Sequence, residues 1–498
     1  MQRGSALHTL MEAAGRGIAA ILTTRFPKAA RQGTLIAAGP GNNGGDGWVV
    51  ARALHALGLP VWVVSPNGPR SELCGHVADL ARAAGVREVE PHGPWPDVGL
   101  IVDAILGTGA TGPLRSTIAG LVERIQEFRG PLLAVDGPTG LDLETGVSYD
   151  GIRADLTVTF GGYRRGHLLA RDEVGDLCVI DIGFGPPDPF WPTLLETWDA
   201  LRVVPPFPAA SHKGGRGRVV IVGGDLGMVG AVRLAARSAF AGGAGLVHVV
   251  APEATATLLA GAEPDVQTAI SSFDRLSEAA ALVLGRADAV VIGPGLGRGP
   301  GRREFIIAVA AASRAPLVID ADGLVAFAGS KDELRRLGGQ RTLVITPHAG
   351  EYRALFPSEA AGIAVDPWAG AVTAATGLGC VVLLKGVPTV VATPGQAPVT
   401  VAGGNPGLAT GGSGDTLSGL IGTWLGQGVE GGPAAAAAAQ ALGEAADLAA
   451  RRLTARGARP MDVIAALGDV WRRWDLVRRD PPIAVAPIRH ELAAPIRV

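Results

Sequence analysis

The chain has 498 residues, of which 47% are hydrophobic and 18% charged, and its formal net charge is −2. This hydrophobic content is enough to build buried cores and excludes a largely disordered chain. The nearly balanced charge provides no large basic surface, so we expect no nucleic-acid partner. The length exceeds what one core supports, and a typical size of about 150 residues per domain predicts two or three domains.

The sequence indicates neither secretion nor a membrane location. Cys74, Cys178 and Cys380 lie far apart along the chain and form no close pair, so we expect three core residues in a reducing compartment. The amphipathic start, which includes an acidic residue, does not resemble a signal peptide. The run "PAAAAAAQALGEAADLAA" carries Glu444 and Asp447 and predicts a buried or half-buried helix. We therefore expect a soluble cytoplasmic protein that contacts no membrane.

Short β-branched runs alternate with Ala- and Leu-rich stretches of helical length along the whole chain. This alternation predicts parallel sheets with helices on both faces, so we expect an α/β protein. In such sheets ligands bind beyond the carboxyl ends of the strands, where nearly every Gly- or Asp-rich motif of this chain falls. The strands are expected at residues 34–39, 60–65, 100–106, 132–138, 156–161, 217–225, 246–252, 289–295, 316–322, 342–348 and 381–387.

A proline-rich segment, residues 185–215, separates the earlier strands from the later ones. Proline at this density suits neither a helix interior nor a central strand, so we expect a domain boundary near residue 200. The last residues of the chain are also interrupted by proline and carry no motif. The expected organisation is one α/β domain over residues 1–197, a second over 198–475 and an extended tail over 476–498.

The stretch "GNNGGDG", residues 41–47, follows the first expected strand. Glycine lets the backbone approach a ligand closely, and the amides that open the next helix point toward an anion. A tight strand-to-helix turn would also explain the glycines. The combination of two Asn and one Asp with these glycines is more specific than a glycine loop alone and favours a binding site.

Two further strands of the first part end in acidic motifs. The motif "VDAILGTGATGP" carries Asp103, and "VDGPTGLDLETG" carries Asp136 and Thr139. An Asp at a strand end also serves as a helix cap, which is the alternative for either residue. Three polar strand ends at one crevice favour a site, and oxygen ligands from Asn, Asp and Thr would suit a hard cation.

Together with "LMEAAGRGIA" and "ADLTVTFG", these motifs resemble the epimerase domain of the NAD(P)H-hydrate repair family, over about residues 8–185. That family interconverts the R and S forms of hydrated NADH and NADPH, which carry a hydroxyl at C6 of the reduced nicotinamide ring. The resemblance implies a Rossmann-like three-layer αβα fold, a potassium ion held by Asn43, Asp103 and Thr139, and acid/base work by Asp136. It also implies contacts to the hydrate from Asn42, Asn43, Gly44, Gly45, Asp46, Gly107, Thr108, Gly109, Ala110, Thr111, Gly112, Pro113 and Asp136.

The sequence departs from this family at two places. The stretch after the "TVTF" strand reads "GGYRRGH", with Arg164 and Arg165 where a Lys is usual. Arginine keeps its proton, so it stabilises negative charge but does not act as a base. The chain before "LMEAAG" is also shorter than in most members. An alternative is therefore a first half that only binds a nucleotide-like ligand or a partner.

The strongest signal of the second part is "NPGLATGGSGDTLSGLIGTWLGQG", which begins at Asn405. Its glycines precede an apolar segment of helical period, an arrangement that presents free amides to a phosphoryl group. Asp415 falls in the first helical turn, where it would accept a proton from a hydroxyl under attack by phosphate or position that hydroxyl. The structural alternative is a glycine-rich helix entry with a capping Asp.

Four more motifs follow expected strands in this part. They are "GPGLG" ending at Gly297, "DADGL" with Asp320 and Asp322, "TPHAGE" with His348, and "KGVPT" beginning at Lys385. A lone histidine is more often structural than functional, but these strand ends meet at one edge of a parallel sheet. His348 is therefore a candidate hydrogen-bond partner for a ligand, and the segment from Lys385 suits phosphate or ribose.

In this order, the motifs resemble the ribokinase-like dehydratase domain of the same family, over about residues 198–475. Its members restore NAD(P)H from the S hydrate while consuming ADP in bacteria or ATP in eukaryotes. The resemblance implies a ribokinase-like αβα fold, a magnesium ion bound with the nucleotide, and a homo-oligomer. It also implies that Ala244, Gly297, His348 and Asp415 contact the hydrate, and that Lys385, Gly386, Val387, Pro388, Thr389 and Gly414 contact the nucleotide.

We therefore expect a bifunctional metabolite repair enzyme. Its first half would epimerise hydrated NADH and NADPH, and its second half would dehydrate the S form with consumption of ADP or ATP. The alternative is a ribokinase-like small-molecule kinase, such as one for vitamin precursors, joined to a non-catalytic nucleotide-binding module. Such kinases lack the first half, which favours the repair enzyme.

Overall fold

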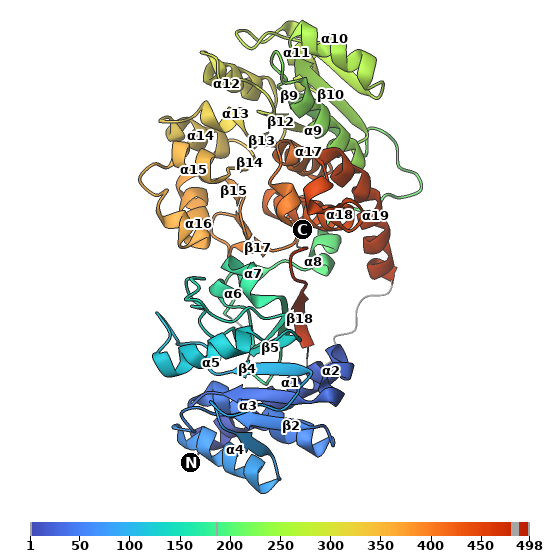
Figure 1. Ribbon diagram of the computed structural model, residues 1–498. Coiled ribbons are helices and arrows are strands. Elements are labelled where there is room, and N and C mark those ends of the chain that lie inside the picture. The colour runs from blue at the N-terminus through green and yellow to red at the C-terminus, as the bar shows by residue number, and fades with distance from the viewer. Residues whose placement is uncertain (1, 186–187, 480–487, 497–498) are drawn as a thin grey trace. The chain divides into compact units, whose positions relative to one another are not determined.

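The computed structural model describes residues 2–185, 188–479 and 488–496 (Figure 1). The chain forms two compact units, each with its own β-sheet. The first unit comprises Met1–Pro186 together with Ile483–Pro495, and the second comprises Pro187–Pro482 with Ile496–Val498. The expected α/β fold in two domains is confirmed.

The first unit contains an eight-stranded sheet in the order β18-β7-β6-β5-β4-β1-β2-β3. Neighbouring strands are parallel except for β18, which runs antiparallel to β7. The strands are β1 Thr34–Ala38, β2 Val61–Val64, β3 Arg87–Val89, β4 Leu100–Ala104, β5 Leu132–Val135, β6 Leu156–Phe160, β7 Asp176–Ile180 and β18 Ile488–Leu492. The helices are α1 Gln2–Arg25, α2 Pro27–Gln32, α3 Asn42–Ala56, α4 Glu72–Ala83, α5 Ser116–Gln126, α6 Arg165–Leu169 and α7 Arg171–Val174.

Two hydrophobic cores lie on opposite faces of this sheet. Strand β1 is buried on both faces, and its successive side chains alternate between them. Ile36 packs in one core with Ile18 of α1 and Trp48 of α3. Leu35 packs in the other with Ile118 of α5. Because helices cover both faces of the sheet, polar residues that bind a ligand are expected at the edge where the strands end.

The second unit contains a ten-stranded sheet in the order β11-β10-β9-β12-β13-β14-β15-β16-β17-β8. Strands β11 to β15 are parallel, and β16 reverses direction. The strands are β8 Thr193–Leu194, β9 Arg218–Val222, β10 Leu246–Ala251, β11 Val266–Ile270, β12 Ala289–Ile292, β13 Leu317–Ile319, β14 Leu343–Ile345, β15 Val381–Leu384, β16 Thr389–Ala392 and β17 Val399–Val401. The helices are α8 Thr197–Val203, α9 Val229–Ala241, α10 Glu253–Ala262, α11 Glu278–Leu284, α12 Arg302–Ala312, α13 Asp322–Val325, α14 Lys331–Gly338, α15 Ala349–Leu355, α16 Pro367–Leu378, α17 Ser413–Gly426, α18 Gly431–Gly457 and α19 Pro460–Arg479, with short 3₁₀ turns η1 Gly362–Ala364 and η2 Pro406–Leu408.

The Ala-rich run forms the buried helix that the sequence predicted, α18. It lies beside α17 and α19, as Figure 1 shows in orange and red, and its small side chains pack in the core of the second unit. Glu444, which argued against a membrane span, accepts hydrogen bonds from Thr197 and from the indole of Trp474. No helix in the described part of the chain is both long and apolar enough to span a membrane.

The limits of the two units differ from those expected near residue 200 and at the tail. Thr193 and Leu194 form β8, which pairs with β17, so the second unit begins before the expected boundary. The expected tail begins inside α19, and residues 488–492 form β18. The physical reason is that β7 has an open edge, which β18 covers while Ile488 packs against the first core.

Each sheet has one point where the strand order reverses. In the first unit this point lies between β1 and β4, because the chain builds β2 and β3 on one side of β1 before it returns to the other. In the second unit it lies between β9 and β12. The crevice beyond the carboxyl ends of the strands at such a point is the usual ligand site of an open α/β sheet.

Candidate active sites

The motifs of the first half converge at the switch point between β1 and β4. The loop "GNNGGDG" opens α3 directly after β1, Asp103 lies in β4, and Asp136 follows β5. A Cβ atom on Gly107 would lie 2.9 Å both from Asn43 Oδ1 and from Asp136 Oδ2. The Asn43 and Asp136 side chains therefore flank the Gly107 backbone, and only glycine leaves room between them.

Two glycines of "GNNGGDG" are required for close packing. A Cβ atom on Gly44 would lie 1.8 Å from the Gly39 carbonyl oxygen, so α3 starts in contact with the end of β1. A Cβ atom on Gly45 would lie 2.7 Å from the sulfur of Met11 in α1. These glycines bring the first turn of α3 close to the sheet edge, where Asn43 then faces the site.

Asp103 and Thr139 form a buried pair, since both side chains have no exposed surface. The Thr139 hydroxyl donates to Asp103 Oδ1 at 2.7 Å, and the Thr139 N–H donates to Oδ2 at 2.7 Å. Burial raises the pKa of Asp103 to about 6, and the bonds from Thr139 oppose this rise. A buried carboxylate with a raised pKa is a group that a nearby cation would stabilise in its charged form.

The side chains around Asp103 fit a hard monovalent cation by their chemistry. Among the residues that the structure describes, no group of three or more His, Cys, Asp or Glu is arranged to hold a metal ion. Asn43, Asp103 and Thr139 instead combine amide, carboxylate and hydroxyl oxygens, which are hard ligands. The Asn43 Nδ2 atom is buried without a hydrogen-bond partner among the described residues, so the fold leaves part of the hydrogen-bonding capacity of this carboxamide unsatisfied.

Asp136 is held in an unusual backbone conformation beside this pair. Its φ angle is 64°, in the left-handed region that non-glycine residues rarely adopt. The Thr108 N–H donates to Asp136 Oδ2 at 2.7 Å, and the Thr159 hydroxyl donates to Oδ1 at 3.1 Å. Burial and then repulsion from Asp136 raise the pKa of Asp46 well above its usual value. Besides Asp103, the site therefore contains two further carboxyl groups, those of Asp46 and Asp136, in different environments, an arrangement suited to acid/base work.

Sequence reasoning missed two side chains that contact Asp136. Thr159 lies in β6, and His167 lies in α6 with Nε2 at 2.7 Å from the Asp136 carbonyl oxygen. The available signal was weak: Thr159 is the second Thr of "TVTF", and His167 ends the stretch "GGYRRGH". Neither residue type is unusual at the end of a strand, so only the fold reveals these contacts.

The two arginines at the usual lysine position are both exposed at the start of α6. The Arg165 guanidinium lies 3.5 Å from Glu144. Arg164 precedes α6, and its backbone N–H donates to His167 Nδ1 at 3.0 Å. The Arg164 backbone thus joins the hydrogen-bonded group around Asp136.

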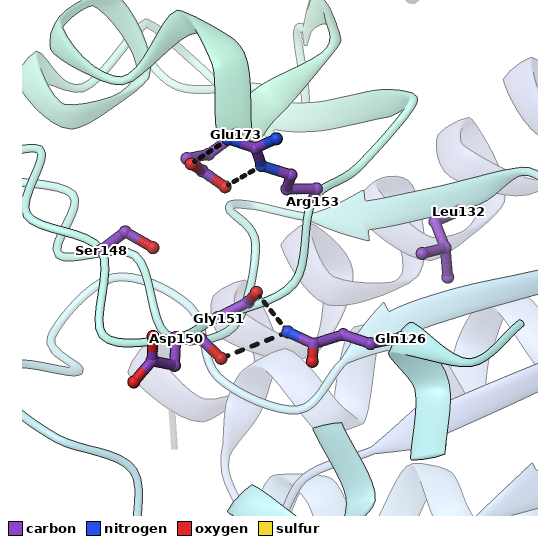
Figure 2. A pocket seen from close by; sticks show the side chains of 7 residues that line it. All are labelled: Gln126, Leu132, Ser148, Asp150, Gly151, Arg153 and Glu173. Atoms are coloured by element: carbon purple, nitrogen blue, oxygen red, sulfur yellow. Dashed lines mark hydrogen bonds and ion pairs between the residues drawn. The ribbon is translucent and has the colours of Figure 1, made fainter. Parts of the chain in front are cut away.

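A cavity of about 540 Å³ in the first unit is separate from these residues. It is lined by Gln126, Leu132, Ser148, Asp150, Gly151, Arg153 and Glu173 (Figure 2). Leu132 is the first residue of β5, whereas Asp136 follows the last, so the cavity lies at the amino edge of the sheet. Its polar groups are largely paired, with Arg153 bonded to Glu173 and the Gln126 amide bonded to the Gly151 carbonyl. It is not the predicted ligand crevice.

In the second unit, a lysine lies between two carboxylates at the ends of three neighbouring strands. Lys385 Nζ lies 2.8 Å from Asp320 Oδ1 and 3.5 Å from Glu351 Oε2. Burial lowers the pKa of Lys385, but the two carboxylates outweigh it and raise that pKa overall. His348 Nδ1 accepts from the Gly350 N–H, and its Nε2 lies 3.3 Å from Glu351 Oε1. We call Asp320, His348, Glu351 and Lys385 the strand-end cluster.

The glycine-rich entry to α17 lies against this strand-end cluster. A Cβ atom on Gly414 would lie 3.4 Å from Lys385 Nζ and 3.5 Å from Asp320 Oδ2. Burial and, after it, the neighbouring Asp320 raise the pKa of Asp415 to about 7, while Lys385 opposes the rise. Asn405 is also fixed here, because its amide donates to Asp447 at 2.8 Å. The structure therefore brings the predicted phosphoryl cradle and Asp415 together with Lys385 and Asp320.

Gly297 lies beside two aspartates of this same edge. Its N–H donates to Asp322 Oδ2 at 3.1 Å, and a Cβ atom on it would lie 2.6 Å from Asp225 Oδ2. Asp225 in turn accepts a hydrogen bond from Arg302 at 2.8 Å. Sequence reasoning had not singled out Asp225 or Arg302, although Asp225 is the last residue of the expected first strand of this half.

Two of the predicted residues, Ala244 and Val387, do not lie with the others. Ala244 is 4% exposed and precedes β10, so it lies at the amino edge of the sheet, away from Gly297, His348 and Asp415. Within the predicted nucleotide segment, Lys385 belongs to the strand-end cluster, whereas Val387 is 72% exposed to solvent.

The fold defines a two-domain α/β enzyme with a candidate active site in each unit. Residues 7–166 match the family described as YjeF-related protein N-terminus, and residues 219–468 match the family described as NAD(P)H-hydrate dehydratase. Two similar relatives are bifunctional NAD(P)H-hydrate repair enzymes. The *Escherichia coli* (strain K12) protein is 36% identical, over 93% of this chain and 89% of its own. The *Salinibacter ruber* protein is 37% identical, over 88% of this chain and 87% of its own.

The chain therefore belongs to the family of bifunctional NAD(P)H-hydrate repair enzymes, with an epimerase domain followed by a dehydratase domain. A solved structure of the ADP/ATP-dependent NAD(P)H-hydrate dehydratase from *Bacillus subtilis*, co-crystallised with ATP and Mg²⁺, is 25% identical with a TM-score of 0.50. It covers 57% of this chain and 98% of its own. The expected family and the ribokinase-like fold of the second half are confirmed, and the kinase alternative is not supported.

Proposed function

We propose that this chain performs both reactions of its family at the two sites described above. The first site epimerises hydrated NADH and NADPH at C6, and the second removes water from the S form at the expense of ADP or ATP. The observation that carries the second assignment is the approach of Gly414 and Asp415 to Lys385 and Asp320. The ATP and Mg²⁺ in the *Bacillus subtilis* dehydratase support a nucleotide with magnesium here too.

Dehydration needs a better leaving group than hydroxide. In the proposed reaction the C6 oxygen attacks the terminal phosphoryl group of the nucleotide, and Asp415 takes or positions the hydroxyl proton. The free amides at the start of α17 stabilise the transferring phosphoryl group. The C6–O bond then breaks as the ring nitrogen donates its lone pair, phosphate leaves, and loss of the C5 proton restores the reduced nicotinamide. Adenine nucleotide one phosphate shorter is the second product.

The carboxylates of the second site fit a divalent cation carried by the nucleotide. Asp320, Asp322, Glu351 and Asp415 gather four carboxyl groups at this edge of the sheet, against the positive charges of Lys385, which pairs with Asp320 and Glu351, and of Arg298, which pairs with Asp322. Magnesium usually takes only one or two protein carboxylates and completes its shell with phosphate and water, which agrees with the absence of a ready all-protein metal site in the described residues. When bound, this ion offsets charge on the phosphates. His348 and Gly297 remain candidate contacts for the hydrate.

For the epimerase site, we propose that the hydrate lies over Gly107 and the loop that ends at Pro113. Asp136 takes the C6 hydroxyl proton and returns a proton to the ring nitrogen as the bond between that nitrogen and C6 breaks to give an aldehyde, and closure of the ring on the other face of the aldehyde reverses these proton transfers. Asn43, Asp103 and Thr139 would hold potassium, which supplies fixed positive charge beside the substrate. The hydrogen bonds from Thr108 and Thr159 orient the Asp136 carboxylate. We also propose that the enzyme works in the cytoplasm, where its substrates occur, and as a homo-oligomer.

One experiment tests the two assignments separately. The R and S hydrates, each purified, are incubated with ADP or ATP, and recovery of reduced nicotinamide is followed by absorbance. Asp415→Asn should abolish recovery from either epimer but leave epimerisation intact. Asp136→Asn should leave recovery from S intact and reduce conversion of R to its spontaneous rate. If the unchanged chain converts R no faster than that spontaneous rate, its first half is a binding module.

A further inference from the structure

We propose that His167 is a positioning residue for epimerisation: its imidazole holds the backbone of Asp136 so that the carboxylate faces the site. This inference rests on the role proposed above for Asp136. It concerns a residue that touches neither the predicted substrate loop nor the cation ligands through any described hydrogen bond.

The contact is direct and buried. His167 has no exposed surface and lies in α6, whereas Asp136 follows β5. Its Nε2 atom lies 2.7 Å from the Asp136 carbonyl oxygen. Its Nδ1 atom accepts a hydrogen bond from the Arg164 N–H at 3.0 Å. Because Nδ1 is the acceptor, Nε2 carries the ring proton and donates a hydrogen bond to the Asp136 carbonyl oxygen.

The imidazole is therefore neutral and works as a bridge rather than as an acid or base. Burial lowers the pKa of His167 to about 4; the adjacent Asp136 opposes this change, and Arg164 and Arg171 add to it. A neutral ring with one donor and one acceptor matches its two backbone partners, since a second ring proton would point at the Arg164 N–H.

Asp136 needs such a support because its backbone is disfavoured on its own. A φ angle of 64° in a residue other than glycine persists only where the surroundings enforce it. The Asp136 N–H donates to the Val158 carbonyl at 2.7 Å, and His167 takes the opposite end of the residue, its carbonyl. With both ends held, the side chain is directed toward Thr108 and Thr159.

The same bridge connects Asp136 to the segment where the family usually has a lysine. The Arg164 N–H binds His167, and His167 in turn binds the Asp136 carbonyl. The backbone position of Arg164, from which its side chain extends, therefore depends on the position of Asp136. A loss of His167 would therefore loosen both the candidate base and the neighbouring cationic segment.

The test compares three substitutions of His167 in the full chain. His167→Gln places an amide N–H near the former Nε2, whereas His167→Asn reaches only the former Nδ1, and His167→Ala removes both. We expect kcat for epimerisation to fall by about 10- to 100-fold in the Ala and Asn variants, because a small misplacement of a reacting group costs this much. His167→Gln should restore most of kcat, and KM should change little in all three.

A matched control separates positioning from general stability. Thr157 is also buried in the first unit, and its hydroxyl donates to the Val174 carbonyl at 2.8 Å without contacting Asp136. Thr157→Val should lower the unfolding midpoint but leave kcat for epimerisation within about twofold. Dehydration of the S hydrate by the same preparations reports that the chain has folded.

Three outcomes would overturn the proposal. The first is an unchanged kcat for epimerisation in His167→Ala. The second is a fall in kcat for epimerisation in Thr157→Val as large as that in His167→Ala, when the two variants have the same unfolding midpoint. The third is an equal kcat for epimerisation in the His167→Gln and His167→Asn variants. These outcomes differ from failure of the proposed function, in which Asp136→Asn would itself still epimerise the R hydrate at the original rate.

Discussion

At the scale of single residues, Asp415 combines a proposed catalytic role with an unfavourable charge. Burial is the main cause of its raised pKa, the neighbouring Asp320 adds to it, and only Lys385 favours the ionised form. An enzyme that needs this carboxylate ionised therefore keeps it at a cost in stability, as is common for catalytic groups in closed sites.

The stability of the second unit should consequently increase in Asp415→Asn. The pKa of this carboxyl rises on folding from 3.8 to about 7. Its contribution to the stability of the fold is therefore most favourable below the unfolded pKa, and that contribution is lost as the pH rises through about 7. At pH 8 the neutral amide avoids the whole cost, and we expect a gain of about 1–4 kcal/mol in the free energy of unfolding. Denaturant unfolding at pH 8 and pH 4 measures it, and a gain that does not shrink at pH 4 would contradict this origin.

A control of opposite sign is available in Asp142. Its pKa is lowered, first by the hydrogen bond from the Thr145 N–H, so its ionised form stabilises the fold above the unfolded pKa. Asp142 lies in the first unit, so Asp142→Asn should lower the stability of that unit at pH 8, where Asp415→Asn raises the stability of the second.

The pH dependence of dehydration should follow the same carboxylate. If ionised Asp415 accepts the hydroxyl proton, kcat/KM for the S hydrate rises with pH through about 7. Lys385 is the group that lowers the pKa of Asp415, so Lys385→Met should move this rise to higher pH as well as slow the reaction. Initial rates between pH 5 and 9 measure both effects, and an unshifted profile in Lys385→Met would exclude Asp415 as the titrating group.

At the scale of elements, the last strand of the chain completes the first sheet. Strand β18 pairs with β7, and in Figure 1 its red arrow lies beside the part of the chain drawn in teal. The buried Arg171 donates to the Ala493 carbonyl at 2.7 Å, and the Ala494 N–H donates to Asp176 at 2.8 Å. Arg25 also pairs with Glu491. The epimerase unit thus depends on residues that follow the dehydratase unit in sequence.

Removal of the residues after Arg479 should therefore harm the first unit more than the second. It exposes the edge of β7 and leaves the Arg171 guanidinium buried without its carbonyl partner, which should destabilise the first unit by about 2 kcal/mol or more. We expect epimerisation to be lost at a lower temperature than in the full chain, while dehydration of the S hydrate retains its thermal midpoint. Residual activity after heating measures both, and equal losses would contradict the assignment of β18 to the first unit.

At the scale of the whole molecule, the proposed mechanisms require different ions in different units. Replacing potassium with lithium should slow epimerisation if Asn43, Asp103 and Thr139 hold potassium, because lithium is the smaller ion. Removing magnesium with a chelator should stop dehydration and leave epimerisation unchanged. Assays of the separate epimers under each condition measure this, with Asp103→Asn as the variant that should lose the potassium effect. A common ion dependence of both reactions would contradict two independent sites.

The sequence supported the broad plan for an identifiable reason. All eleven expected strands occur, because each is a short apolar run that is buried on both faces of a parallel sheet. Strands such as β3 and β17 were missed, since they lie toward a sheet edge and polar residues interrupt them: β3 reads Arg-Glu-Val and β17 reads Val-Thr-Val. The grouping of Asp103 with Asp136, and of Lys385 with Asp320, followed from the rule that parallel strands end at one edge.

What the sequence alone determined is the order of strands and helices and the chemical groups at each strand end, because these depend on neighbouring residues in the chain. The tertiary structure decided which of those groups meet. It placed Ala244 at the opposite edge, joined His167 to Asp136, and brought β18 back to β7 across more than three hundred residues. Such contacts arise from the packing of distant segments, for which the local pattern contains no signal.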